Sequence, residues 1–415
     1  MNETKKLFHG WVIVGLFFIM LLILDSVSTA SHFFLSHLLS KWGSDYKMLG
    51  WISAVAFIPL IPASLIIGKL VDVVGARKVM LYGCVIAGVG TMLFAAATRP
   101  WHLSPAMSIT EMGIMAATGV AVLIVLMNWF KRRRGLAIGL AMAGGAIGRA
   151  LFGPISSMFP DSMSGARVSV VVLGLVTMAI TVMIVLFYIK NQPSEMGLLP
   201  DGDESGGNEH EITIGHTLGK AFRTPAFWFV VAGLFLANGA TATIDLYSSI
   251  YLSDILNYSA SSIGTVNGFA RGFSIVGLLA FGLFADRWGP RGAFVLSAVM
   301  IAIGIAILAS PSPFWIMALY VVPYGLAQSA PSVLTPMIVT DCHGLSNFGF
   351  IYTVIGLFAS LGTILFTPIG PLIYGYTNSY RPGFAVAIIL ALLSGYCMYM
   401  AKPQKREGRE ERATD

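Results

Sequence analysis

Charged residues are scarce in this chain: 11% of its 415 residues are Asp, Glu, Lys or Arg, whereas 56% are hydrophobic. A water-soluble protein has roughly 25% charged residues, so this sequence cannot hide its apolar surface in an aqueous core. Most of that surface must therefore face lipid or other helices. The 45 glycines suit close helix–helix approach in a bilayer, where small residues line the contacts between helices.

Motifs for enzymatic chemistry are also missing. The sequence contains no phosphate-binding P-loop, HExxH zinc motif, nucleophile elbow or pair of closely spaced cysteines. Cys84, Cys342 and Cys397 lie far apart, and we interpret them as packing residues rather than a disulfide framework. These absences argue against an enzyme and against ATP-driven transport by this chain alone. We expect no metal site and no cofactor, and we expect His210 and His216 to be solvated loop residues.

Long apolar runs dominate what is present. Twelve of them are long enough to cross a bilayer, which takes about 20 residues. They lie at 11–39, 48–71, 79–98, 104–129, 136–158, 168–190, 226–252, 261–285, 292–310, 313–340, 345–374 and 383–401. Six runs precede and six follow the one sustained polar stretch. The sequence therefore predicts an all-α membrane protein with twelve transmembrane helices in two six-helix halves.

The polar stretch and the basic residues predict how these halves are organised. We expect an N-terminal bundle at 1–190, a cytoplasmic linker at 191–224, a C-terminal bundle at 225–402 and a cytoplasmic tail at 403–415. With the N-terminus inside, nineteen Lys and Arg residues fall in cytoplasmic segments and five in outer loops. This asymmetry predicts that both termini are cytoplasmic. We expect a monomeric, multi-pass protein of the plasma (inner) membrane whose basic segments meet lipid rather than nucleic acid.

A charged turn occurs twice, with an offset of 214 residues: GKLVDVVGARK at 68–78 and GLFADRWGPRG at 282–292. A repeated turn in a chain built as two halves is typical of transporters. The turns could simply anchor topology, or their Asp and Arg residues could latch helices in one transport state and release them in another. Repetition at one offset favours a gating role for the four charged residues: Asp72, Arg77, Asp286 and Arg291.

The two turns resemble the loop signature of the major facilitator superfamily. KRRRGLAIG at 131–139 is similar to the basic entry to that superfamily's fifth helix, and GGAIGRALFGP at 144–154 to its glycine-rich motif. HGWVIV at 9–14 and FRTPAFW at 222–228 resemble the monocarboxylate and oxalate/formate branch. The resemblance covers the whole chain and implies the major facilitator fold.

That branch implies a substrate-binding arginine on helix eight, about two turns before the aspartate of the second charged turn. Leu278 stands at this position, and the helix-eight arginine of this chain is Arg271. The family's substrate residue is therefore not carried over directly.

Five acidic or basic residues lie in the interior of the predicted spans, away from the span ends: Asp25, Glu111, Arg149, Asp245 and Arg271. A charge near the bilayer centre costs on the order of 2.5–3.5 kcal/mol, so each marks a candidate functional site. At about 1.5 Å per residue, Asp25, Arg149 and Arg271 reach a common level roughly 21–22 Å from the cytoplasmic turns. This depth predicts a central anion site that uses Arg271 and Arg149, because guanidinium groups bind carboxylates bidentately. A salt bridge between Asp25 and Arg149 is the alternative role for Arg149.

The predicted function is that of a secondary carrier for a small organic anion, a mono- or dicarboxylate, working by alternating access. Further substrate contacts are expected from four polar side chains: Asn267, Tyr247, Tyr324 and Gln328. Three acids are candidates for carrying a coupled proton: Asp25, Glu111 and Asp245. Anion exchange would need no such acid, so proton symport and anion exchange both stay open. The alternatives are an exporter of amphipathic compounds and a transporter-like ligand sensor.

Overall fold

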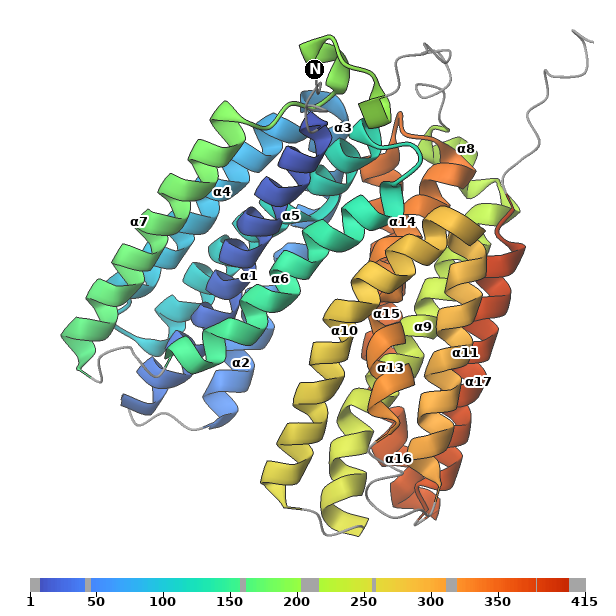
Figure 1. Ribbon diagram of the computed structural model, residues 1–415. Coiled ribbons are helices and arrows are strands. Elements are labelled where there is room, and N and C mark those ends of the chain that lie inside the picture. The colour runs from blue at the N-terminus through green and yellow to red at the C-terminus, as the bar shows by residue number, and fades with distance from the viewer. Residues whose placement is uncertain are drawn as a thin grey trace, which may run out of the picture. The chain divides into compact units, whose positions relative to one another are not determined.

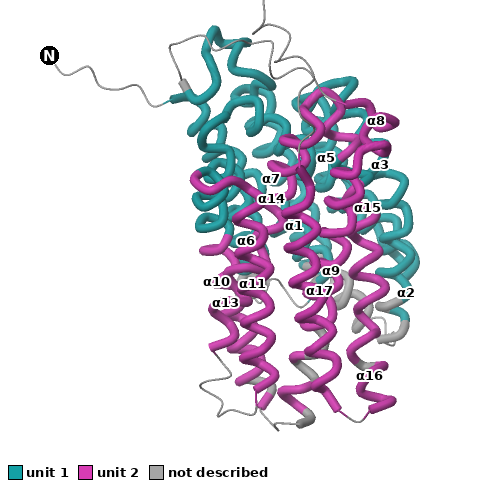
Figure 2. The backbone as a smooth tube through the Cα atoms, turned by 90° about the vertical axis from the view of Figure 1, so that its right-hand side faces the viewer, with its two compact units in different colours: residues 1–209, 278–286, 352–354 teal, residues 210–277, 287–351, 355–415 magenta. Residues whose placement is uncertain are grey.

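The computed structural model describes residues 8–41, 46–156, 162–202, 216–255, 259–310, 319–377 and 379–402, and every regular element in these ranges is a helix. The chain divides into two compact units, which Figure 2 shows in different colours. Unit 1 contains residues 1–209, 278–286 and 352–354, and unit 2 contains residues 210–277, 287–351 and 355–415.

Seven α-helices of the described residues lie in unit 1 (Figure 1): α1 (His9–Lys41), α2 (Tyr46–Phe57), α3 (Leu60–Val74), α4 (Ala76–Leu93), α5 (Leu103–Trp129), α6 (Arg134–Ser156) and α7 (Met163–Phe187). Short 3-10 turns η1 (Phe94–Ala96) and η2 (Pro100–His102) join α4 to α5, and η3 (Pro193–Met196) and η4 (Pro200–Gly202) follow α7. Within this unit α1 packs against α6, while α4 packs against both α5 and α7.

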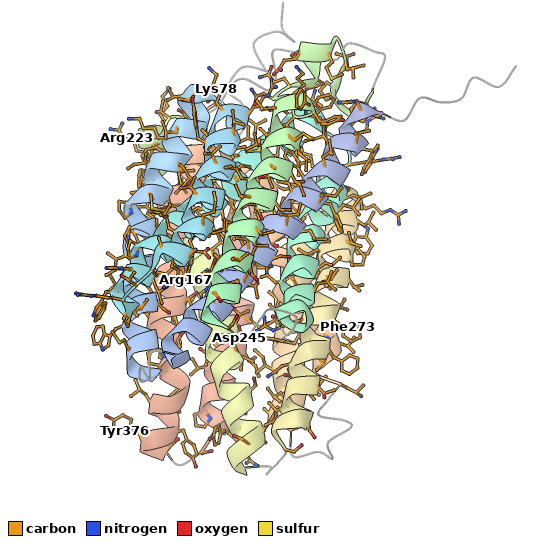
Figure 3. The ribbon with its side chains drawn as sticks, turned by 90° about the vertical axis from the view of Figure 1, so that its left-hand side faces the viewer. Lys78, Arg167, Arg223, Asp245, Phe273 and Tyr376 are labelled. Carbon is orange, nitrogen blue, oxygen red and sulfur yellow. The ribbon has the colours of Figure 1, made fainter. Side chains whose placement is uncertain are left out.

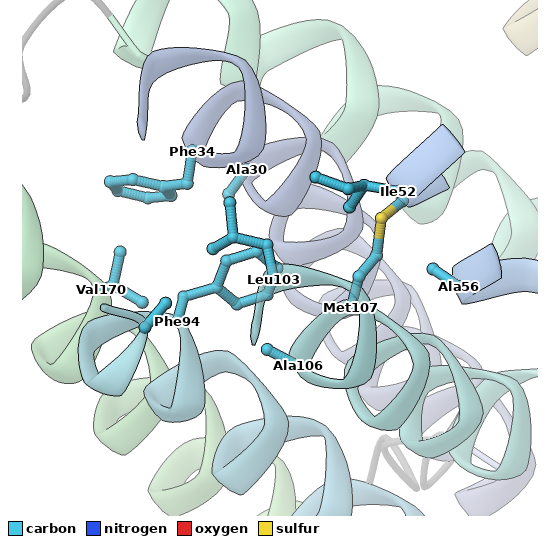
Figure 4. Close-up of a cluster of buried hydrophobic side chains, with 10 residues drawn as sticks. Ala30, Phe34, Ile52, Ala56, Phe94, Leu103, Ala106, Met107 and Val170 are labelled. Atoms are coloured by element: carbon cyan, nitrogen blue, oxygen red, sulfur yellow. The ribbon is translucent and has the colours of Figure 1, made fainter. Parts of the chain in front are cut away.

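Close packing in unit 1 depends on glycine and on apolar side chains. The Cα of Gly148 in α6 lies so near α1 that an added Cβ would overlap the Leu22 carbonyl oxygen. Near the other end of α1, Ala30 and Phe34 join a buried cluster with residues of α2, α5 and α7 (Figure 4). This cluster and the glycine contact fix α1 along the bundle, and α1 carries Asp25.

Unit 2 contains the remaining helices of the described residues: α8 (Leu218–Phe222), α9 (Pro225–Ile250), the π-helical turn η6 (Tyr251–Ile255), α10 (Ala260–Trp288), α11 (Pro290–Ala309), α13 (Val321–Gln328), α14 (Ala330–His343), α15 (Phe348–Phe366), α16 (Ile369–Thr377) and α17 (Arg381–Met400). Residues 278–286 of α10 and 352–354 of α15 group with unit 1. In unit 2, α17 packs against α9 and α11, and α11 also packs against α13.

Ten helical stretches among the described residues are long and apolar enough to cross a membrane. Each corresponds to one of the apolar runs that the sequence predicts as spans. The predicted spans 136–158 and 313–340 are not among the ten, since each includes residues outside the described ranges. Part of the first forms α6, and part of the second forms α13 and α14.

Within the described residues, three predicted spans are interrupted rather than continuous. Pro59 separates α2 from α3, Pro331 stands in the first turn of α14, and Pro368 separates α15 from α16. Proline lacks the backbone N–H that continues a helix, and its ring clashes with the preceding turn. Hydropathy alone does not reveal such breaks, because proline interrupts a helix without making its neighbours polar.

Candidate functional site

An ion pair in unit 1 joins α1 to α6. Nη1 of Arg149 donates to Oδ2 of Asp25 at 2.6 Å, and the two side chains are 55% and 17% exposed. Gly145 of α6 leaves room for this carboxylate, since an added Cβ would overlap Oδ2 of Asp25. The sequence left Arg149 open between a substrate contact and a salt bridge with Asp25, and in this structure it forms the salt bridge.

A second acid lies close by on α5. Ser28, about one turn beyond Asp25 on α1, donates its hydroxyl to Oε1 of Glu111 at 2.7 Å. Among the described residues no basic side chain forms an ion pair with Glu111. Unit 1 therefore holds one carboxylate, Asp25, that is paired with a guanidinium and a second, Glu111, that accepts from a hydroxyl.

Unit 2 contains the other predicted charges. Figure 3 labels Asp245, on α9, whose Oδ1 accepts a hydrogen bond from the Tyr324 hydroxyl at 2.9 Å. Arg271 of α10 is near enough to act electrostatically on the Asp245 carboxylate. Its side chain is exposed, however, and the guanidinium has no hydrogen bond or ion pair to the described residues. Among the described residues, Arg271 thus differs from Arg149, which is paired with Asp25.

The other predicted substrate contacts differ in how they are placed. Gln328 of α13 donates to the Ala270 carbonyl oxygen at 3.2 Å, beside Arg271. Asn267 lies one turn before Arg271 on α10 and is half-buried. Tyr247 belongs to α9, but its side chain lies outside what the structure describes.

The first charged turn connects α3 to α4 through Gly75, whose φ of 95° favours glycine over residues with a Cβ. Arg77 donates through Nε to the Val185 carbonyl oxygen at 3.3 Å and through Nη2 to that of Leu186. These carbonyls lie in the last turn of α7, where cations are favourable. Asp72 is half-buried on α3.

The second charged turn uses its aspartate differently. The Asp286 carboxylate accepts hydrogen bonds from the backbone N–H groups of Gly135 at 2.7 Å and Leu136 at 2.9 Å. These donors belong to the first turn of α6, which has no partners for them within the helix. Arg291 lies near Cys342, to which it is hydrogen-bonded. Both turns thus bind helix ends, a role that residue spacing alone does not reveal.

The linker after α7 adds contacts that the sequence interpretation did not include. Asp201 accepts hydrogen bonds from the backbone N–H groups of Lys131 and Arg132, just before α6. Its φ of 58° is left-handed, a conformation that aspartate tolerates better than most residues. Asn191 accepts from the Arg77 N–H at 2.9 Å. The Asp201-Gly202 pair is the turn signal that could have indicated this contact.

His216 is a loop residue, as predicted, but it is half-buried rather than fully solvated. Its backbone N–H donates to the His343 carbonyl oxygen at 2.8 Å, and the Nδ1 atoms of the two rings are 3.4 Å apart. Burial and the neighbouring His216 ring lower the pKa of His343 to about 4. His210 lies outside the described residues, within which no three His, Cys, Asp or Glu side chains are grouped to hold a metal ion.

The sequence model of the Major Facilitator Superfamily matches residues 16–280 and 252–415. The chain belongs to this superfamily. With its long apolar helices, it is a multi-pass integral membrane transporter of small molecules rather than an enzyme.

Relatives place the chain near one branch of the superfamily. Monocarboxylate transporter 12 of Rattus norvegicus is 22% identical over 430 residues, covering 97% of this chain and 87% of that protein. MFS transporter asaE of Aspergillus flavus is 24% identical over 368 residues, covering 83% and 74%. The chain therefore resembles the monocarboxylate branch.

A solved structure shares the fold. The fucose:proton symporter of E. coli aligns over 95% of this chain and 99% of that chain, with a TM-score of 0.69 and 13% identity. This likeness supports the major facilitator fold and no more.

Proposed function

We propose that this chain is a secondary carrier for a small organic anion, a mono- or dicarboxylate, and that Arg271 is the principal contact of that anion. One observation carries the proposal: Arg271 has an exposed guanidinium, unpaired among the described residues, within a membrane span, whereas Arg149 already binds Asp25. An unpaired charge at this depth is costly and calls for a ligand. The similarity to monocarboxylate transporters supports the same substrate class.

The chemistry of Arg271 favours a carboxylate as its ligand. Its planar guanidinium offers parallel N–H donors that match the two oxygens of a carboxylate. Asn267, one turn away on α10, and Gln328, bonded to the Ala270 carbonyl, stand beside it as further polar groups. We assign Arg149, Tyr247 and Tyr324 supporting roles in substrate binding.

Coupling is assigned to the membrane acids. Glu111 is a candidate proton carrier because it accepts from Ser28 and has no ion pair among the described residues. Asp25 and Asp245 are the other candidates, each held by a different partner. Transport would then proceed by proton symport, or by anion exchange if none of these acids titrates during the cycle.

The organisation of the chain follows from the same proposal. It has twelve membrane helices in two six-helix halves, at 1–190 and 225–402, with the linker at 191–224, the tail at 403–415 and both termini in the cytoplasm. The protein acts as a monomer in the plasma membrane. Conformational change is gated by the charged turns, through their four charged residues: Asp72, Arg77, Asp286 and Arg291.

Replacement of Arg271 by lysine tests the proposal. Lys keeps the charge but loses the two-pronged geometry, so Arg271→Lys should raise the Kd for carboxylates at least about tenfold. Ligands are first found by thermal shift of the purified protein against mono- and dicarboxylates, because a ligand stabilises the folded state that binds it. Arg167→Lys is the matched control, since Arg167 bonds the Ala97 carbonyl oxygen instead.

The outcome also separates the alternatives. An unchanged Kd in Arg271→Lys would remove Arg271 from the substrate site. Stabilisation by neutral amphipathic compounds, insensitive to Arg271→Lys, would favour an exporter. Ligand binding without uptake into proteoliposomes would favour a sensor.

A further inference from the structure

One face of helix α13 contacts Asp245 of α9 and the backbone next to Arg271 of α10. The Tyr324 hydroxyl donates to Oδ1 of Asp245 on α9 at 2.9 Å. Four residues later, Gln328 donates to the carbonyl oxygen of Ala270 on α10 at 3.2 Å, next to Arg271. Residues four apart lie on the same side of a helix. The same face therefore holds the acid on one helix and the backbone beside the guanidinium on another.

Tyr324 is firmly held in this position. Its side chain is 3% exposed. The backbone of α13 lies against α11 at Gly304, where an added Cβ would come within 2.8 Å of the Tyr324 Cβ, and against α10 at Gly325, where one would come within 2.8 Å of the Ala270 carbonyl oxygen. This packing therefore limits how far the hydroxyl can follow the Asp245 carboxylate if that group moves.

Asp245 and Arg271 carry opposite charges but are not bonded to each other. The charge of Arg271 acts on the Asp245 carboxylate, yet among the described residues the two groups form no ion pair. Arg149 and Asp25, by contrast, do form one. A hydrogen bond to a charged group is strong enough to oppose such an attraction. Loss of the phenol hydroxyl would leave the exposed Asp245 side chain free to turn toward the guanidinium.

We infer that Tyr324 is a positioning residue, whose hydroxyl holds the Asp245 carboxylate away from Arg271 and so keeps the guanidinium open to the substrate anion. Without this contact, Asp245 occupies Arg271 and competes with the substrate. The inference rests on the proposed role of Arg271 as the anion contact, but the position of Asp245 can be tested without any substrate.

The test measures the reactivity of Arg271 toward phenylglyoxal, which modifies unpaired guanidinium groups, by mass spectrometry of the full-length protein in detergent. Tyr324→Phe removes only the hydroxyl and should slow labelling of Arg271 about tenfold. Adding Asp245→Asn to Tyr324→Phe should restore the wild-type rate. Tyr320→Phe is the matched control: Tyr320 is buried one turn earlier and hydrogen-bonds to Ser248 instead.

Asp245→Glu tests whether a carboxylate at position 245 can block Arg271 while Tyr324 is intact. Its carboxylate extends one methylene further and should reach Arg271, so labelling should again slow. Carboxylate binding should change in parallel with the labelling rate. The Kd for the carboxylate should rise about tenfold in Tyr324→Phe and return to the wild-type value in the double variant.

Two results would overturn the inference: wild-type labelling of Arg271 in Tyr324→Phe, or no recovery when Asp245→Asn is added. The second result is the one expected if the role of Tyr324 is merely structural. In that case Tyr324→Phe would slow labelling of Arg271 equally, whether position 245 carries the native aspartate or asparagine. If Arg271→Lys leaves anion binding unchanged while the labelling pattern holds, the proposed function fails and the positioning role of Tyr324 stands.

Discussion

Two arginines of the same charge have different surroundings in this chain. Arg149 forms an ion pair with Asp25 at 2.6 Å, while Arg271 is exposed and its guanidinium has no partner among the described residues. Removing one member of a desolvated pair leaves the other uncompensated, which costs about 3–5 kcal/mol in deep burial. Arg149 is 55% exposed, so its cost is smaller. The presence of an ion-pair partner among the described residues therefore distinguishes Arg149 from Arg271.

This pairing predicts the outcome of a double-mutant cycle. Asp25→Asn leaves the Arg149 charge without its partner, and Arg149→Gln leaves that of Asp25. The double variant should be less impaired than the sum of the single effects, by about 0.5–3 kcal/mol. Melting temperature and substrate uptake both report the coupling. Additive effects would contradict the pair, and a selective loss of pH-driven uptake in Asp25→Asn, with exchange retained, would identify Asp25 as a proton carrier instead.

The lowered pKa of His343 predicts that the free energy of unfolding depends on pH. The pKa of His343 is about 4 in the folded chain, against about 6.5 in an exposed histidine. As pH falls below 6.5, the unfolded chain takes up a proton that the buried ring does not, so folded-state stability decreases until about pH 4. At pH 5 the loss should be about 1–2 kcal/mol.

Thermal melts between pH 7.5 and 5 measure this loss. His343→Gln should flatten that part of the profile, whereas the control His102→Gln, at an exposed position, should not. A wild-type profile in His343→Gln would show that another group titrates.

At the scale of whole helices, charged side chains bind helix ends. Arg77 bonds the carbonyls of the last turn of α7, and Asp286 bonds the N–H groups of the first turn of α6. Both arrangements place the charge where the helix dipole favours it. A transport cycle that moves these helices must break or remake such contacts, because they depend on specific positions in the end turns.

Asp286→Asn should therefore change turnover more than substrate affinity. The amide keeps an acceptor but loses the charge, which weakens the contact with α6 by about 0.3–1 kcal/mol. Uptake rates and Kd values in proteoliposomes separate the two effects. Glu195→Gln is the control, since Glu195 accepts from linker backbone groups. A large loss of affinity with unchanged turnover would argue that Asp286 acts at the substrate site.

At the scale of the whole molecule, the proposed topology places Arg99 outside the cell and Arg133 inside. After the three native cysteines are replaced by serine, Arg99→Cys should react with an impermeant maleimide in intact cells. Arg133→Cys should react only after permeabilisation. The reverse pattern would show that the topology is inverted. Labelling of both cysteines in intact cells would place both positions outside the cell, so the segment between them would not be a single membrane span.

Apolar length and composition were sufficient to predict the helical membrane fold, because few structures satisfy the backbone in lipid, and the repeated charged turn indicated the superfamily. The sequence also marked the charged residues of the candidate site, since such residues are rare within spans. It offered the Asp25–Arg149 salt bridge as one of two roles for Arg149, but it did not indicate the contact between Asp245 and Tyr324. Asp25 meets Arg149 and Asp245 meets Tyr324 through contacts between distant segments, and periodicity along one helix carries no information about its neighbour.

The lack of a side chain at Gly145 has a consequence for how positions 25 and 145 vary among related carriers. A methyl group at this position would occupy the space of the Asp25 carboxylate and push it from Arg149, whereas at Gly15 of α1 a methyl group would meet nothing within 4 Å. An acid at position 25 and glycine at position 145 should accordingly be retained or lost together as related carriers diverge. In relatives that lack the acid at position 25, alanine or serine should be tolerated at position 145 of α6. Substitutions at position 15 should occur independently of both positions.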